Sequence, residues 1–443
     1  MTRSVVLGLL VALSMTLSVR LWMGENQLPS PKAHGSTAPD DLDALPSPGE
    51  VLAPQGVVVH LGQGRHTGLT PGSPAYARLW GKVEPLLAGL PEAIPTAPES
   101  GATAQEVAAQ RDEPGLEVIL PLALPLEQWA DLWNSGWWTT QTSPSTTPTT
   151  RRVLLAAGKN PAAYVWVEGS TSVLRATLPG GPRLEAILKD VRTQPGYVEL
   201  PPSLDGLRID PGIYVPDPPP RLAALHAIRR TSNPEEYARR FFLDLSVVRV
   251  IRERDSAVIF TDGRQGLRVY PSGASEYTSA QTLPPAGELT FPEALRQAVE
   301  YAAAHGGWPP QAYLVGDRTV DAAPSLEFTY RLAGLPLEGQ PPLQITLNSA
   351  GVIGYQRWMW KPSDDQAALQ PAIGAKEALG TVRRHWQQLF PWNPDPRITD
   401  LHLAYLLPPR GAEDSTLRPV WAVTVHGGHR TYVDALTGEP AGG

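Results

Sequence analysis

Two pairs of histidines stand where imidazoles could bind a metal ion. His426 and His429 are separated by two glycines, and Asp434 follows them. Neutral imidazoles bind zinc, and a nearby carboxylate could be a third ligand or orient a ring. The sequence HGGH, however, is typical of a hairpin tip, where glycines make the turn and polar residues are common. Turn histidines are therefore the favoured interpretation, as they are for His60 and His66, which flank a glycine-rich loop.

Charged residues cluster in the segment TDGRQGLR, which contains Asp262, Arg264 and Arg268. Asp262 and the glycine after it predict a turn between two strands. One interpretation is that the two arginines are solvated or pair with nearby carboxylates. The other is that this hairpin contacts a partner protein, since arginine is enriched in interface hot spots. Turn chemistry alone accounts for the Asp-Gly pair and favours the first interpretation, while partner binding stays open.

The densest group of aromatic residues consists of Trp129, Trp133, Trp137 and Trp138. Trp129 and Trp133 are one helical turn apart and are expected in the core. Trp137 and Trp138 follow a glycine and could instead form an exposed platform for a carbohydrate or a partner. Large aromatic side chains are mostly buried, which favours the core for all four.

Known catalytic and cofactor motifs are missing from the sequence. There is no phosphate-binding GxxxxGK[ST] loop, no HExxH zinc helix and no GxSxG nucleophile turn. The chain has no cysteine, which excludes disulfides and thiolate chemistry. Its net charge of −7 disfavours nucleic acid as a partner. The sequence thus predicts no catalytic residue, no metal and no cofactor.

An apolar segment at residues 4–24, SVVLGLLVALSMTLSVRLWMG, is long enough to span a bilayer as a helix. Arg3 precedes it, so the positive-inside rule places the N-terminus in the cytoplasm and the rest of the chain outside. A cleaved signal peptide is the alternative, but the bulky residues Arg20, Leu21 and Trp22 do not suit a cleavage site. We expect a retained single-pass anchor in the cell membrane.

Small residues recur every four positions along this anchor, at Ser4, Gly8, Ala12 and Thr16. Such a face allows two helices to approach closely in lipid and could dock onto a partner helix. Small residues are also common in any membrane helix, so chance is an equal alternative.

The remaining sequence predicts an α+β fold in which helices alternate with antiparallel meanders. The expected organisation is an anchor, a Pro/Ser-rich linker and three extracytoplasmic α+β domains. Their ranges are 1–24, 25–54, 55–215, 222–362 and 370–443. Each of the last two domains is expected to pack a helix on an antiparallel meander sheet.

Local signals place the helices of these domains. Ser73 and the following proline predict the start of a helix at 73–90, and Thr290 with Glu293 predicts a capping box. Further helices are expected at 126–133, 182–192, 233–242 and 374–390. Residues 91–115 are interpreted as an exposed excursion.

One block of sequence carries a resemblance to a known family. Residues 241–278, FFLDLSVVRVIRERDSAVIFTDGRQGLRVYPSGASEYT, resemble the middle region of YycH-type proteins. Other stretches agree with that family in order: the anchor, LEVILPLALPLEQWADLW (116–133), PGIYVP (211–216) and the ending at 417–440. That ending also resembles the closing hairpin of the wider YycH/YycI and PepSY-like group.

The resemblance implies a regulator without catalytic residues. Proteins of the YycH type are membrane-anchored and regulate the sensor histidine kinase WalK (YycG) of Gram-positive bacteria, together with the sister protein YycI. That kinase controls cell-wall metabolism. The alternative hypothesis is an extracytoplasmic wall-binding module or a metal-dependent hydrolase that uses His426 and His429.

Overall fold

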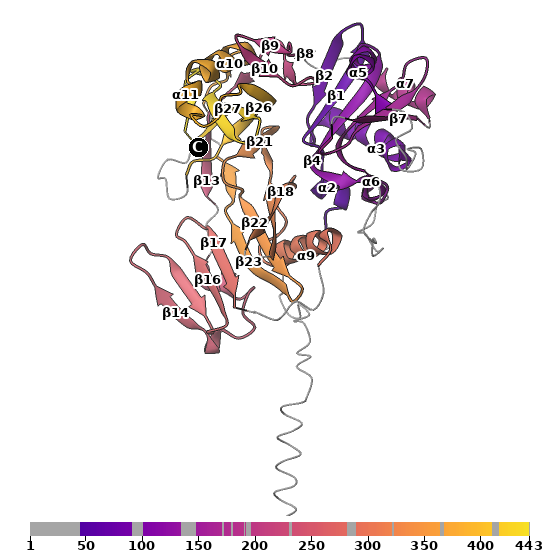
Figure 1. The fold of residues 1–443 in the computed structure, drawn as a ribbon. Coiled ribbons are helices and arrows are strands. Elements are labelled where there is room, and N and C mark those ends of the chain that lie inside the picture. Colours follow the sequence, from indigo (N-terminus) through magenta and orange to yellow (C-terminus); the bar gives the residue numbers. More distant parts are fainter. Residues whose placement is uncertain are drawn as a thin grey trace, which may run out of the picture. The chain divides into compact units, whose positions relative to one another are not determined.

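Antiparallel sheets make up most of the fold, and helices cover only parts of their faces (Figure 1). The computed structural model describes residues 45–90, 101–133, 148–170, 172–178, 180–189, 191, 196–229, 233–280, 289–320, 323–363, 367–409 and 416–442. The predicted α+β class is confirmed. Among these described residues, no helix is both long and apolar enough to cross a bilayer. The predicted anchor at 4–24 lies outside them.

The first sheet has nine strands, all paired antiparallel, in the order β11-β8-β2-β1-β4-β5-β6-β7-β3. In chain order they are β1 (Gly56–Gly62), β2 (Arg65–Leu69), β3 (Gly101–Ala102), β4 (Pro114–Pro125), β5 (Thr149–Ala156), β6 (Ala162–Trp166), β7 (Val173–Thr177), β8 (Gly196–Glu199) and β11 (Tyr214–Pro216). β1 is buried over four consecutive residues, so both faces of the sheet are covered at its centre.

Helices on the two faces of this sheet bury alternate residues of its strands. α3 (Pro74–Ala88), α6 (Leu126–Trp133) and α7 (Gly181–Leu188) share a core with Val118 and Val153. α5 (Ala104–Arg111) packs through Val107 against Leu154 on the opposite face. α5 also corrects the predicted excursion at 91–115: its N-cap Thr103 accepts a hydrogen bond from the amide of Glu106 and starts a helix that the weak apolar pattern did not reveal.

The fold already includes residues at the end of the predicted linker. α2 (Pro48–Val51) follows the N-cap Ser47, whose hydroxyl accepts from the amide of Glu50. Val51 and Leu52 are fully buried. The packed structure therefore begins before residue 54, where the predicted linker (25–54) was expected to end.

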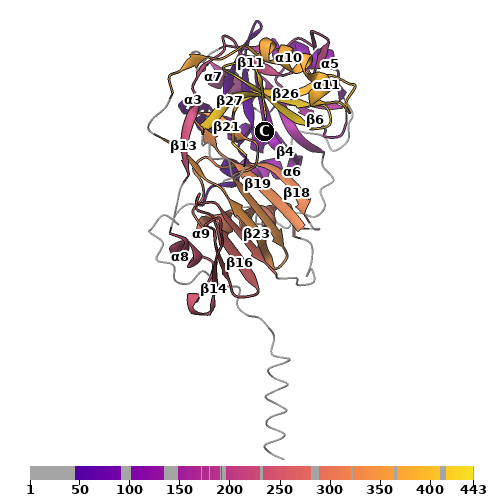
Figure 2. The same ribbon diagram turned by 90° about the vertical axis from the view of Figure 1, so that its left-hand side faces the viewer.

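The second sheet has eight antiparallel strands in the order β14-β15-β16-β17-β23-β22-β19-β18 (Figure 2). They are β14 (Arg249–Arg252), β15 (Val258–Thr261), β16 (Gln265–Val269), β17 (Ser275–Ser279), β18 (Tyr313–Val320), β19 (Ala323–Thr329), β22 (Leu343–Asn348) and β23 (Gly351–Arg357). α8 (Pro234–Ala238) and the short 3-10 helix η2 (Leu245–Val247) precede it.

α9 (Phe291–Ala304) packs on the central strands of this second sheet. Its start confirms the predicted cap: the Glu293 carboxylate accepts hydrogen bonds from the amide (3.0 Å) and the hydroxyl (2.7 Å) of Thr290. Leu295, Ala298 and Val299 recur at helical spacing and are buried.

The third sheet combines a predicted meander with strands from distant parts of the chain. The predicted part is β26 (Arg397–Leu406), β27 (Thr416–Val425) and β28 (Arg430–Asp434), beside α10 (Ala375–Arg384) and α11 (Trp386–Leu389). The added strands are β9 (Ser203–Leu204), β10 (Leu207–Ile209), β13 (Leu225–Arg229), β20 (Arg331–Leu332), β21 (Leu335–Glu338), β24 (Trp360–Pro362) and β29 (Pro440–Ala441). β10 and β21 both pair parallel with β26.

A separate pair, β12 (Arg221–Leu222) with β25 (Gln370–Pro371), lies outside the three sheets. The chain from Leu45 onward forms one compact unit, so the predicted boundaries between the three domains stay predictions.

Candidate functional site

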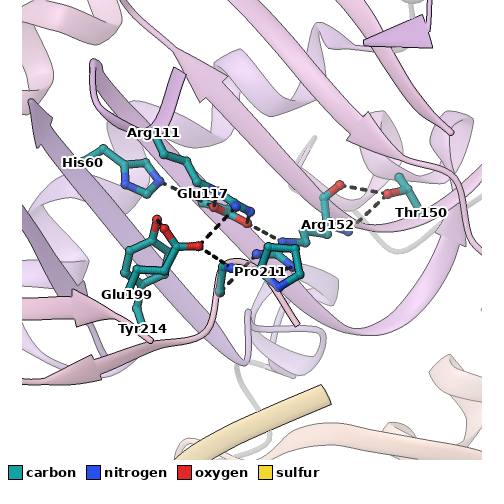
Figure 3. A network of polar contacts seen from close by, with 9 residues as sticks. His60, Arg111, Glu117, Thr150, Arg152, Glu199, Pro211 and Tyr214 are labelled. Atoms are coloured by element: carbon teal, nitrogen blue, oxygen red, sulfur yellow. Dashed lines mark hydrogen bonds and ion pairs between the residues drawn. The ribbon is translucent and has the colours of Figure 1, made fainter. Parts of the chain in front are cut away.

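A buried carboxylate organises a polar network on the face of the first sheet that α5 covers (Figure 3). Glu117 of β4 is fully buried. It lies opposite Val58 of β1 and Leu154 of β5, so His60 and Arg152, each two residues further along, point to the same face. Arg111, the last residue of α5, reaches this face from the covering helix.

Two guanidinium groups neutralise Glu117. Arg111 donates through Nε to Oε2 and through Nη2 to Oε1, both at 3.2 Å. Arg152 donates through Nε to Oε1. Both guanidinium groups also lie over the ring of Trp166, at 5.6 and 4.9 Å from its centroid. A paired and hydrogen-bonded charge of this kind can stay ionised in the interior.

A second carboxylate extends the network to the segment between β8 and β11. Glu199 accepts from Arg111 Nη1 at 3.5 Å, from the amide of Gly212 at 2.6 Å and from the Tyr214 hydroxyl at 3.3 Å. Arg152 Nη2 donates to the carbonyl of Gly212 at 3.1 Å. These contacts fasten residues 211–214 onto the face that carries Glu117.

The prediction that His60 and His66 are turn histidines is wrong. They pair in register across the β1–β2 hairpin, His60 is fully buried and His66 is 9% exposed. Their Nδ1 atoms are 2.9 Å apart, and His60 Nε2 is 3.5 Å from Glu117 Oε2. Burial and the neighbouring His60 lower the pKa of His66. Only one of the two Nδ1 atoms can carry a proton in this contact, so the pair shares a single donor.

This network is suited to holding strands together and is not suited to acid–base catalysis. Burial alone would raise the pKa of Glu117, but the guanidiniums of Arg152 and Arg111 outweigh it and hold the pKa far below its usual range. A general acid or base needs a pKa near the working pH and access to the substrate. In the described parts of the chain, no group of three or more His, Asp or Glu side chains could hold a metal ion.

The predicted hairpin at His426 and His429 is confirmed. Gly427 and Gly428 form the turn with φ of +94° and +80°, a backbone region that favours glycine. Both histidines are exposed, and His429 lies against Trp392 with ring centroids 4.3 Å apart. The Asp434 carboxylate accepts from the amides of Leu436 and Thr437, so it serves a turn of its own.

Arg268 is held locally, while Arg264 extends from an exposed turn. Arg268 Nε is 2.7 Å from Glu253 Oε2 and its Nη2 is 3.0 Å from Asp255 Oδ2. Asp262 accepts from the backbone amide of Arg264 at 2.9 Å, which confirms the predicted turn. Partner binding by these two arginines stays a prediction.

The tryptophans and the small residues of the anchor are the remaining predicted residues; some lie in the core and the others lie outside the described residues. Trp129 and Trp133 are buried, as expected, at 0% and 8% exposure. Trp137, Trp138 and the small face of the anchor, Ser4, Gly8, Ala12 and Thr16, lie outside the described residues.

A second polar network lies on the third sheet around His402. Its Nδ1 is 2.9 Å from Asp400 Oδ2, and its Nε2 is 3.1 Å from Glu338 Oε1. Arg430 Nη1 donates to both oxygens of Glu338, at 2.7 and 2.6 Å. Burial lowers the pKa of His402, but Asp400 and Glu338 outweigh it and raise the pKa to about 10. The imidazole is therefore a cation at neutral pH, with both ring nitrogens donating, and has no lone pair for a metal.

We expect this network to make the free energy of unfolding decrease as the pH rises above neutral. The pKa of His402 is higher in the folded chain, about 10, than the 6.5 of a free side chain. Its stabilisation is therefore complete below about pH 6.5 and is lost as the pH rises through about 10. Between pH 7 and 10 the free energy of unfolding should fall more steeply for the wild type than for His402→Gln, measured by urea titration.

A matched control is His385→Gln, because the Nδ1 of His385 lies 3.0 Å from a backbone carbonyl oxygen, that of Thr381, whereas His402 bonds to two carboxylates. This variant should keep the wild-type pH dependence. If the free energies of unfolding of the wild type and His402→Gln change in parallel with pH, His402 is not the cause of the pH dependence.

Both networks contain residues that sequence reasoning missed, although each had a signal. Glu117 is the only charge inside the apolar strand sequence LEVILP, and such a residue must be paired if the strand is central. Asp400 and His402 alternate in DLHLAY, which puts them on one face of a strand. Their partners, Arg111 and Glu338, come from other elements, and no local pattern reveals them.

Comparison with known proteins gives a likeness at the level of the fold. No family model matches the chain, and no curated protein sequence matches it. Among solved structures, YycH from Bacillus subtilis superimposes with a TM-score of 0.57 at 14% sequence identity, covering 88% of this chain and 97% of that chain. An uncharacterised protein from Eubacterium rectale is also similar in part, with a TM-score of 0.37 at 14% identity, over 56% of this chain and 93% of that one. The first match confirms that the chain has the fold expected from the YycH resemblance.

Proposed function

We propose that this chain is a membrane-anchored extracytoplasmic regulator of a sensor histidine kinase of the WalK (YycG) type, acting by protein–protein contacts. The observation that carries the proposal is the YycH fold over 88% of this chain and 97% of the YycH chain. The sequence resemblance at 241–278 supports the same assignment. Expected partners are the kinase and a YycI-like sister protein.

The polar networks fit a binding protein better than an enzyme. The carboxylates of Glu117 and Glu338 are ionised and used in ion pairs within the fold. His402 is bonded at both ring nitrogens. These groups hold strands in place within the fold.

A regulator of this kind would act by shifting the population of kinase states. Binding can move that equilibrium only by the difference between its affinities for the two states. The outer domains and the anchor would together supply this difference. The regulator needs no catalytic group for this mechanism.

Co-purification of the full chain with the kinase from membranes tests the proposal. We expect Gly8→Leu with Ala12→Leu to reduce the captured kinase about tenfold, equivalent to about 1.4 kcal/mol, because both changes block close approach of a partner helix. Ser14→Leu is the matched control, since it enlarges a small residue on the other side of the predicted helix.

The outcomes separate two claims. Failure of the wild-type chain to capture the kinase would refute the proposed function. Equal capture by the wild type and the double variant would refute only the docking role of the anchor helix.

A further inference from the structure

The edge of the second sheet at β14 is open. In the described part of the chain, β14 pairs only with β15 and ends the strand order (Figures 1 and 2). In antiparallel pairing, alternate residues direct their N–H and C=O groups to the neighbour and the others direct them away. All four residues of β14 are exposed. Its outward groups can therefore pair with another strand.

The same edge concentrates exposed apolar side chains. The described residues include eight large apolar side chains that are exposed. Four of them lie within nine residues at this edge: Leu243 (90% exposed), Val247 (71%), Val250 (47%) and Ile251 (37%). Single exposed apolar residues are ordinary, but here four follow closely along the chain; Val250 and Ile251 lie on opposite faces of the edge strand, so an added strand could cover both.

Arginines frame the apolar pair of β14. Arg249 and Arg252 flank Val250 and Ile251. No carboxylate among the described residues lies within ion-pair distance of Arg249. Arg252 has one exposed partner, Glu235, at 3.1 Å.

The nearby carboxylates are engaged elsewhere. Glu253 and Asp255 pair with Arg268, and Asp244 accepts from the amide of Ser246 at 2.8 Å. The edge therefore offers positive charge at both ends of an apolar centre.

This charge pattern argues against a second copy of the chain as the occupant. The sequence Arg-Val-Ile-Arg reads almost the same in both directions. Antiparallel pairing of two copies that covers the apolar pair would place Arg249 opposite Arg252 at both ends. Like charges directly opposite one another destabilise a strand pair. A strand with acidic residues at these positions would instead gain two favourable pairs.

We propose that β14 receives an extended segment of a partner protein as an added antiparallel strand. That segment carries two apolar residues facing Val250 and Ile251, with an acidic residue on each side facing Arg249 and Arg252. Main-chain hydrogen bonds along the edge supply part of the affinity, and the flanking charges select the partner. The inference rests on the proposed function, in which the chain works through protein contacts, and it names the surface and the partner's chemistry.

Binding of labelled decapeptides to the full chain in detergent micelles, followed by fluorescence anisotropy, tests this proposal. Two probes share Ser/Thr flanks and differ only in the centre, Glu-Val-Val-Glu or Lys-Val-Val-Lys. At low salt we expect the wild type to prefer the acidic probe about tenfold, because two attractive pairs replace two repulsive ones. Arg249→Glu with Arg252→Glu should reverse this preference.

Two controls isolate the edge. Arg183→Glu with Lys376→Glu changes the net charge by the same amount at exposed residues of other elements, α7 and α10, and should keep the acidic preference. An acidic probe with one central valine replaced by proline should bind at least about tenfold more weakly, because proline removes a strand donor.

Equal binding of the two probes to the wild type, or an unchanged preference in the reversed variant, would overturn the proposal. A wild-type dimer in sedimentation that Arg249→Glu with Arg252→Glu abolishes would assign the edge to a second copy and overturn it as well. If the wild type captures the kinase but binds the two probes equally, only the proposed role of the β14 edge is refuted. Probe preference without any kinase capture would refute only the kinase assignment.

Discussion

Glu117→Gln should destabilise the chain by about 3–5 kcal/mol. The substitution keeps the shape of the side chain and removes the charge that neutralises two guanidinium groups. Arg111 is 5% exposed, and its one remaining carboxylate partner among the described residues would be Glu199, whose oxygen is more distant at 3.5 Å. Urea unfolding of the full chain in detergent micelles, followed by circular dichroism, measures the loss.

The control for this prediction is Glu113→Gln, an exposed carboxylate four residues earlier, which should change stability by less than about 0.5 kcal/mol. Replacing all three charges together, with Glu117→Met, Arg111→Met and Arg152→Met, should recover most of the lost stability, because buried ion networks often exchange for apolar packing at little cost. If the triple variant is as unstable as Glu117→Gln, uncompensated charge is not the cause.

Local sequence signals predicted those elements whose start or apolar face is encoded within one turn. α3 begins at Ser73, whose hydroxyl accepts from the amide of Tyr76 at 3.2 Å, and α9 begins at the Thr290–Glu293 cap. Both helices bury an apolar face whose residues recur at helical spacing. α5 was missed because its short sequence buries only Val107 and Arg111, too few residues to form an apolar stripe.

Local sequence patterns do not predict the strand pairing of the third sheet. β26 pairs in parallel with β10, almost two hundred residues earlier in the chain, and with β21. Parallel pairing of distant strands depends on the path of the whole chain, and a two- or three-residue strand has no periodicity to read. The same limit applies to the site. Glu117 was visible as a charge in an apolar strand, but Arg111 and Arg152 become its partners only through the fold.

Trp129→Ala should cost about 3–5 kcal/mol, since it removes a fully buried indole from the core between α6 and the first sheet. Trp129 Nε1 also donates to the carbonyl of Thr150 at 3.3 Å. Trp129→Phe should cost less, about 1–3 kcal/mol, because it removes this hydrogen bond but keeps most of the packing. Trp392→Ala, at a 52% exposed side chain, serves as the control and should cost less than about 1 kcal/mol.

Trp129 and Glu117 should also be energetically coupled, because Thr150 links the two regions. The Thr150 hydroxyl donates to the carbonyl of Arg152 at 3.0 Å and accepts from the amide of Arg152 at 3.1 Å (Figure 3). The indole therefore fixes the start of β5, and β5 presents the Arg152 guanidinium to Glu117. A double-mutant cycle of Trp129→Phe with Glu117→Gln should give an interaction energy of at least about 0.5 kcal/mol. Additivity within about 0.3 kcal/mol would mean that β5 holds Arg152 in place without the tryptophan.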